Sequence, residues 1–220
     1  IPVPWSTMSA LSSLSWENIR EHYDERIDVH EELLRLHDQG PSDDFSQLLV
    51  GLSDPAGNYS AAEHRLGPKI LGSNTNVNRR LHDLAGKFRA LTQPRTVPQL
   101  VRTAGLSYLA IGVGSEASCL MNPGVCWVAN TRSIWTHLVI KHADNFAKAD
   151  EELKLYRDND TSSEMAYQIW AHIHGLLDTS MTRVSKEGAR LASADGVEPG
   201  EIAFLWADAI ASALYAEHHG

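Results

Sequence analysis

Residues 106–118 read Leu-Ser-Tyr-Leu-Ala-Ile-Gly-Val-Gly-Ser-Glu-Ala-Ser, and residues 126–135 read Cys-Trp-Val-Ala-Asn-Thr-Arg-Ser-Ile-Trp. Together these stretches predict a helix, a tight Ile-Gly-Val-Gly hairpin, a second helix, and a short loop that leads into a third. Glycine adopts positive φ readily and lets another backbone approach closely. A hairpin at a helix amino terminus also turns backbone N–H groups outward, where they can hold an anion such as a phosphate group. The sequence therefore predicts an anion-binding turn at residues 112–115.

Length and composition indicate one compact domain, or two closely packed lobes, with a sizeable core. The chain has 220 residues, of which 43% are hydrophobic and 21% are charged. It contains no apolar run of about 18 residues, so we expect no transmembrane helix. Residues 1–8 lack the features of a signal peptide, and a cytoplasmic location is the expectation. Cys119 and Cys126 are too few for a disulfide scaffold or an iron–sulfur cluster, and we expect two buried free thiols.

The net charge of −9 argues against a nucleic-acid partner, but the charges are unevenly distributed. Residues 17–44 contain ten acids against three arginines, whereas residues 65–102 contain eight bases against one acid. Such a basic segment is commonly a solvated helix face. Because it leads directly into the glycine hairpin, we favour a surface that binds a polyanion.

Apolar spacing predicts helices along nearly the whole chain and no clear strand. This pattern is typical of an all-α domain of about ten helices. We expect an N-terminal extension at 1–14, a main domain at 15–179, and a C-terminal helical extension at 180–220 packed on that domain. The helices are expected over 15–37, 43–52, 61–70, 76–91, 96–104, 106–110, 130–142, 148–156, 162–177, 180–194 and 199–218.

The order of these elements and two motifs resemble the helix-hairpin-helix DNA glycosylase superfamily of the endonuclease III type. The family pattern is approximately Leu-Pro-Gly-Val-Gly-x-Lys-x-Ala, followed by Val-Asp-Thr-His/Arg-Val. Here residues 110–118 read Ala-Ile-Gly-Val-Gly-Ser-Glu-Ala-Ser, and residues 128–134 read Val-Ala-Asn-Thr-Arg-Ser-Ile. Weaker similarities lie at residues 44–53, 149–153 and 170–175. The resemblance covers roughly residues 43–177.

The resemblance implies an all-α helix-hairpin-helix bundle that flips a modified base out of duplex DNA. It implies a phosphate clamp at the hairpin, which could also hold a monovalent cation. It further implies that Asn58 or Tyr59 is inserted as a wedge into the base stack, and that Arg132 makes another contact with DNA. We expect a monomer that binds duplex DNA and carries no other cofactor or metal. The clamp would consist of Gly112, Val113, Gly114 and Ser115. The base pocket would be lined by Trp127, Trp135 and Trp170, although tryptophans are more commonly plain core.

The residues at the two catalytic positions depart from the family pattern. Glu116 stands where the resemblance implies the Schiff-base lysine, so we expect no lyase chemistry by that route. Asn130 stands where it implies the aspartate that stabilises the positively charged sugar. Asn130 could still orient a water molecule, and Glu116 could supply the carboxylate. Other candidate carboxylates are Asp44, Asp54 and Glu63.

These departures lead to one expected function and two alternatives. We expect a monofunctional glycosylase that acts in base excision. Its expected substrate is a bulky modified base in foreign DNA, and its expected role is DNA repair or antiviral defence. A DNA-binding member of the fold without catalysis is the first alternative. The second is a HEPN-like ribonuclease, because Arg132 and His137 have the Arg-x4-His spacing of that all-α family. The histidines at 22, 30 and 37 lack the paired Glu-x-x-His motifs of a di-metal site, and we interpret them as part of an acidic helix face.

Overall fold

The computed structural model describes residues 9–156 and 163–220, without the side chains of Ser60 and Glu63. Over these ranges the chain folds into α-helices and short 3-10 helices and contains no strand. The predicted all-α class is therefore confirmed. None of the described helices is long and apolar enough to cross a membrane.

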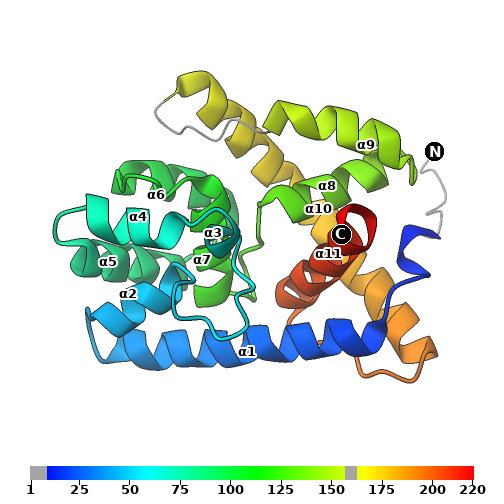
Figure 1. Cartoon of the computed structure of the whole chain (residues 1–220), viewed down its shortest axis with the longest axis horizontal. Coiled ribbons are helices and arrows are strands. Elements are labelled where there is room, and N and C mark those ends of the chain that lie inside the picture. The colour runs from blue at the N-terminus through cyan, green and yellow to red at the C-terminus, as the bar shows by residue number, and fades with distance from the viewer. Residues whose placement is uncertain (1–8, 157–162) are drawn as a thin grey trace.

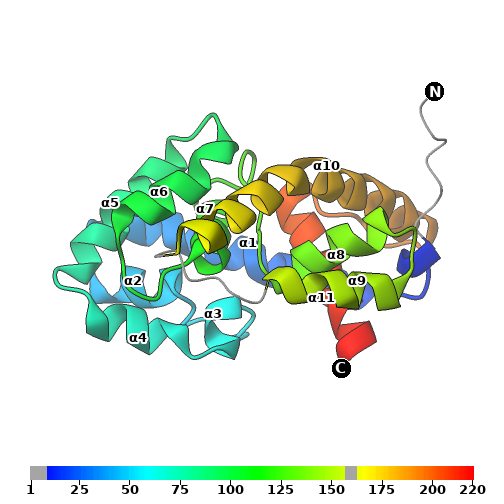
Figure 2. The same cartoon turned by 90° about the horizontal axis from the view of Figure 1, so that it is seen from above.

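The helices form two groups joined by two long helices (Figure 1). Helix α1 (Trp16–Asp38) runs beneath both groups, and α10 (Glu164–Ala194) crosses both when seen from above (Figure 2). The first group consists of α2 (Asp43–Leu49), α3 (Ser60–Glu63), α4 (Leu66–Ser73), α5 (Val77–Arg89), α6 (Val97–Ala104) and α7 (Ile111–Met121). The second group contains α8 (Thr131–Lys141), α9 (Phe146–Leu153) and α11 (Ala203–His219). The 3-10 helices are Ser9–Leu11, Pro94–Thr96 and Lys154–Tyr156.

Helix α1 holds the two groups together because one of its faces is buried along its whole length. Its amino terminus is capped by Ser15, whose hydroxyl accepts a hydrogen bond from the Asn18 N–H. The helix contacts α2 and α7 of the first group and α11 of the second. A single charged residue, Arg26, interrupts its otherwise apolar stripe. The buried positions recur every three or four residues: Trp16, Ile19, Tyr23, Arg26, Val29, Leu33 and Leu36.

One continuous hydrophobic core extends through both groups. Where α1 meets α11, the ring of Trp206 packs against Trp16 and, edge on, against Tyr23, with a centroid separation of 5.7 Å from Tyr23. Cys119 and Cys126 are buried and free, which confirms the prediction for both thiols.

The turn between α6 and α7 lies earlier in the chain than the sequence predicted. Gly112 and Gly114 lie in the first turn of α7, and neither has a positive φ. The chain instead reverses at Gly105, with φ of +60°, and at Tyr108, with φ of +66°. Residues 106–110, expected to be helical, form this turn. The predicted hairpin at the two glycines was wrong because α7 already begins at Ile111, so the chain has to reverse before this residue, at Gly105 and Tyr108.

The turn is fastened to the end of α4. The Asn74 side chain accepts a hydrogen bond from the Ser107 N–H at 2.9 Å and donates one to the Ser107 carbonyl at 3.1 Å. Arg80 of α5 donates to the carbonyls of Ala104 and Gly105, at the last turn of α6. The geometry of this turn is therefore fixed from two neighbouring helices.

Close helix packing explains the glycine at position 114. A Cβ atom on Gly114 would lie 2.3 Å from Cγ2 of the buried Val101 of α6. A Cβ on Gly112 would meet nothing closer than 3.9 Å, at the Trp170 ring. The absence of a side chain at Gly114 thus lets α6 and α7 approach each other.

The carboxyl-terminal helices also differ from the expectation. Residues 164–194 form one helix, α10, where two helices at 162–177 and 180–194 were predicted. The predicted boundary between residues 179 and 180 therefore falls inside a continuous helix. Tertiary contacts remove the expected break, because buried side chains such as Leu177, Ser180 and Met181 pack across it.

We expect Gly114→Ala to lower the free energy of unfolding by about 1–3 kcal/mol, because the added methyl group overlaps Val101. Gly112→Ala is the matched control, two residues away on the same helix. That substitution should be neutral or stabilising by up to about 1 kcal/mol, because alanine favours the helix. Urea denaturation measures both variants, and equal losses would contradict the packing role of Gly114.

Candidate functional site

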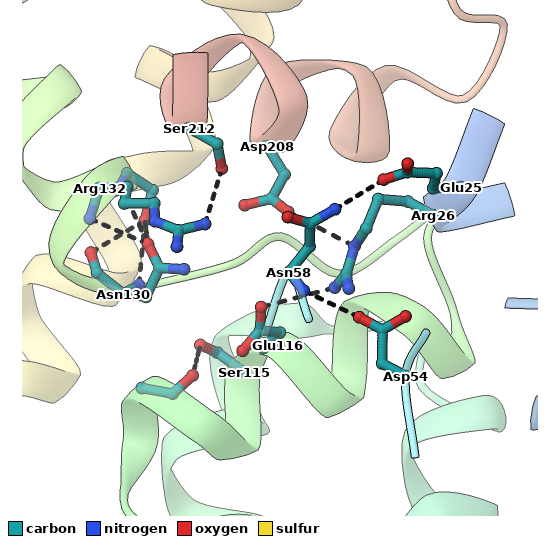
Figure 3. Close-up of polar contacts among 12 residues, drawn as sticks. Glu25, Arg26, Asp54, Asn58, Ser115, Glu116, Asn130, Arg132, Asp208 and Ser212 are labelled. Atoms are coloured by element: carbon teal, nitrogen blue, oxygen red, sulfur yellow. Dashed lines mark hydrogen bonds and ion pairs between the residues drawn. The ribbon is translucent and has the colours of Figure 1, made fainter. Parts of the chain in front are cut away.

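A buried cluster of charged side chains lies where α1, α7 and α11 meet (Figure 3). Arg26 Nη2 is 3.5 Å from Glu116 Oε1, and Arg26 Nε is 3.9 Å from Asp208 Oδ2. The exposed fractions of the three side chains are 1% for Arg26, 1% for Glu116 and 4% for Asp208. The Tyr59 ring covers the guanidinium, whose Cζ lies 4.6 Å from the ring centroid. The cluster thus joins both helix groups through α1.

The electrostatics of the cluster depend on Arg26. Burial by itself would lower the pKa of Arg26, but the nearby carboxylates of Glu116 and Asp208 and the Tyr59 ring raise it above its usual value. The guanidinium is therefore fully charged. Two carboxylates and one guanidinium share a space from which water is excluded. Leaving either carboxylate without its partner would therefore cost folding free energy. Asp208 Oδ1 is buried and has no hydrogen-bond partner among the described residues.

A pocket of about 380 Å³ lies beside this cluster, between α1 and α11. Arg132 reaches it from the start of α8 and donates to the Ser212 hydroxyl at 3.2 Å. Asn58 reaches it from the loop before α3, where its amide donates to Glu25 and its N–H donates to Asp54. The polar residues that line the pocket are Asn18, His22, Asn58, Arg132, Ser212, Tyr215 and His219.

His22 is a neutral donor or acceptor at this pocket. Burial lowers the pKa of His22, and the charges of Arg26 and Arg132 lower it further, against the opposing effect of Asp208. Its Nε2 atom is buried and has no partner in the described part of the chain. The lining of the pocket therefore includes a guanidinium, an amide and a neutral imidazole, around a volume that suits a small-molecule group.

The amino termini of α7 and α8 lie against each other next to the cluster. The Ser115 hydroxyl of α7 donates to the Gly112 carbonyl and accepts from the Ala129 N–H at 2.9 Å. Asn130 caps α8, since its side-chain oxygen accepts from the N–H groups of Arg132 and Ser133. The Ser133 hydroxyl in turn accepts from the Asn130 N–H and completes a capping box. Asn130 thus has a structural task, and its buried Nδ2 has no partner among the described residues.

The structure brings some of the predicted site residues together and separates others. Glu116 belongs to the charged cluster, and Asn58 and Arg132 line the pocket. Asp44 lies exposed in the first turn of α2, outside the cluster, and Glu63 lies outside the described side chains. Tyr59, predicted as a DNA wedge, is fully buried against Arg26.

The predicted phosphate clamp at residues 112–115 is also not formed as expected, because most of it is buried. Val113, Gly114 and Ser115 are buried, and only Gly112 of the four is partly exposed. Gly114 packs against Val101 of α6, and Ser115 accepts a hydrogen bond from the Ala129 N–H. Gly112 lies beside Trp170 of α10. Only the first N–H groups of α7 are left to face a ligand.

The three tryptophans predicted to form a base pocket belong to the core. Trp127 stacks on His174 and donates its indole N–H to the His174 carbonyl at 2.8 Å. Trp135 is fully buried and donates to Asp150, and Trp170 is 4% exposed beside Gly112. None of the three lines the pocket between α1 and α11. Burial lowers the pKa of His174 to about 4, so this histidine is neutral and structural.

The Arg132 and His137 pair of the ribonuclease alternative is not brought together. His137 is close to the Ser180 hydroxyl of α10, at 2.6 Å, whereas Arg132 donates to Ser212 of α11. Residues five apart in a helix point about 140° away from each other. The structure therefore gives this pair no common site within one chain.

Sequence reasoning missed Arg26 and Asp208, although each carries a signal. Arg26 occupies a core position in the apolar stripe of α1, and Asp208 is the single acid in the apolar stretch 203–214. A charged residue at a core position indicates a buried partner. The partner itself lies on another helix and cannot be read from the spacing.

Neither models of protein families, nor curated proteins, nor solved structures give a match to this chain. The geometry of the cluster and the pocket therefore carries the functional argument.

We expect Arg26→Met to lower the free energy of unfolding by about 3–5 kcal/mol, because it leaves Glu116 and Asp208 buried without their counter-ion. In the double variant with Glu116→Gln the loss should be smaller than the sum of the two single losses. Arg35→Met on the same helix is the matched control, since the Arg35–Glu32 pair is exposed and such ion pairs contribute little to stability. If urea denaturation gave equal losses for Arg26→Met and Arg35→Met, the cluster would not have this role.

Proposed function

We propose that the protein binds duplex DNA and hydrolyses the N-glycosidic bond of a modified base without lyase chemistry. The observation that carries this proposal is the Asp208 carboxylate. It lies buried 3.9 Å from Arg26 and within electrostatic reach of Arg132. Asp208 does not itself line the pocket of about 380 Å³ between α1 and α11, but its chain neighbour Ala209 and Arg132 do.

The chemistry requires a negative charge near the sugar. When the bond between C1′ and the base nitrogen breaks, positive charge develops on the sugar, and a fixed carboxylate stabilises it. Water then adds its hydroxyl group to C1′ and gives its proton to the departing base. Asp208 offers the charge that Asn130 lacks. Within the described lining no lysine is present, and Glu116 cannot form an imine, which favours hydrolysis over strand cleavage.

The turn between α6 and α7 is the part of the surface that we assign to DNA. Tyr108 at its tip is 53% exposed, and Lys69 Nζ lies 5.8 Å from the Tyr108 ring centroid. In the described structure Ala110 makes no side-chain cap for α7. The first N–H groups of α7 therefore have no side-chain acceptor at Ala110, and of the residues that carry them Gly112 is partly exposed. A phosphate oxygen is the kind of acceptor that such a helix end favours. An exposed aromatic ring, a lysine and an uncapped helix together suit a DNA backbone.

A second candidate is DNA binding without catalysis. It is favoured by one specific observation: the residues at both family catalytic positions already have structural tasks. Glu116 pairs with Arg26, and Asn130 caps α8. If Asp208 is not used in chemistry, the pocket serves recognition alone.

We expect Lys69→Ala to weaken binding of an unmodified DNA duplex and to reduce the slope of log affinity against log salt by about 1, because one phosphate contact is lost. Lys154→Ala is the matched control, since Lys154 pairs with Glu151 at α9 and lies outside the turn. Fluorescence anisotropy over a range of salt concentrations measures both variants. An unchanged slope for Lys69→Ala would contradict the assigned surface.

We expect the wild-type protein to leave alkali-labile abasic sites in at least one duplex of a panel of modified bases that includes bulky substituted pyrimidines. Asp208→Asn should abolish the product and keep duplex binding, which also reports that the variant is folded. Asn130→Ala and Glu116→Gln test the two family positions in the same assay, and Glu25→Gln at the rim is the control. Duplex binding without any product from the wild type would support the second candidate instead.

A further inference from the structure

Two histidines and an aspartate converge at the carboxyl-terminal end of α11. Asp150 Oδ2 lies 3.5 Å from His218 Nε2, and Asp150 Oδ1 lies 3.4 Å from His219 Nε2. The three ligand atoms lie within 4.8 Å of one another. In a tetrahedral site with bonds of about 2.0–2.1 Å, neighbouring ligand atoms are about 3.4 Å apart. Each imidazole nitrogen thus lies at about this separation from one oxygen of the Asp150 carboxylate, His218 from Oδ2 and His219 from Oδ1.

The aspartate of this triad is held in place by a buried partner. The indole N–H of Trp135, a fully buried residue of α8, donates to Asp150 Oδ1 at 2.7 Å. Groups that hydrogen-bond to a ligating side chain orient it and typically change metal affinity by about 10–100-fold. An exposed carboxylate in a simple surface ion pair needs no such support.

Aromatic packing also holds both imidazole rings. The His218 ring stacks on Trp135 with a centroid separation of 5.1 Å and lies 4.6 Å from the Phe146 ring. The His219 ring packs on Tyr215 at 4.3 Å. These contacts restrict the rotamers before any ion binds, which reduces the entropy cost of binding.

The electrostatics of this position favour a cation. His218 and His219 occupy the last turn of α11, where the helix dipole places a partial negative charge. The Asp150 carboxylate adds a full negative charge, and the side chains are partly exposed, so that an ion can enter from solvent. His219 also lines the pocket between α1 and α11.

We propose that Asp150, His218 and His219 form a binding site for a divalent transition-metal ion of the zinc class. Two imidazole nitrogens and one carboxylate oxygen suit zinc or cobalt, whereas calcium and magnesium prefer oxygen ligands. Three protein ligands leave at least one coordination position for water. This site stands independently of the proposed DNA glycosylase activity. The sequence did not indicate it, because Asp150 lies on a different helix from the histidine pair.

The test is a Co²⁺ titration of the full chain, purified without a histidine tag and treated with EDTA. We expect saturable binding of one ion with a visible d–d absorption typical of imidazole ligation, and displacement of Co²⁺ by Zn²⁺. Asp150→Asn, His218→Ala and His219→Ala should each weaken binding about 10-fold or more. Helical circular dichroism and the midpoint of urea denaturation report that each variant is folded.

His142→Ala is the matched control, because His142 Nε2 pairs with the single carboxylate of Glu152 at 2.8 Å. It should leave Co²⁺ affinity unchanged. Absence of saturable Co²⁺ binding would overturn the proposal and leave a surface ion pair. Binding that survives all three ligand substitutions, or that is lost equally in His142→Ala, would overturn it too.

Discussion

The Arg26 guanidinium, buried between the Glu116 and Asp208 carboxylates, is the interaction on which the arrangement of this protein depends. The three side chains come from α1, α7 and α11, and these three helices contact one another at the junction of the two helix groups. Water is excluded there, so separating the groups would expose the core and leave buried charges without their partners. The ion pairs fix how the groups fit together, while the apolar area around Trp16 and Trp206 supplies most of the favourable free energy.

The junction also determines where chemistry is possible. The amino termini of α7 and α8 meet beside the cluster through Ser115 and Ala129, and Arg132 extends from the second of these helices into the pocket. Two positive helix ends and two arginines stand against two carboxylates. This arrangement places the Asp208 carboxylate in a dry environment, where a negative charge stabilises developing positive charge most strongly. The proposed glycosylase function follows from that placement and from the assigned DNA surface at the α6–α7 turn.

The same structure shows how glycines can mislead a reading of the sequence. The Ile-Gly-Val-Gly motif was expected to form the turn, yet it lies within α7, and Gly114 serves close packing against Val101. The chain reverses instead at Gly105 and Tyr108, and the Asn74 side chain at the end of α4 stabilises this turn through a hydrogen bond with Ser107. A glycine that permits a turn and a glycine that permits a close approach look identical in the sequence. Only the position of the partner helix distinguishes them.

The sequence by itself determined the all-helical class, most helix positions, and the burial of Cys119 and Cys126, because these follow from apolar periodicity within each segment. Of the residues that it predicted for the site, Asn58 and Arg132 line the pocket and Glu116 lies in the buried cluster. Only the tertiary structure decided that α10 continues through residue 179, that Tyr59 and the tryptophans are core, and that Arg26 and Asp208 belong to the site. The reason is physical: periodicity records which face of a helix is buried, but the partner of a buried charge lies on another helix.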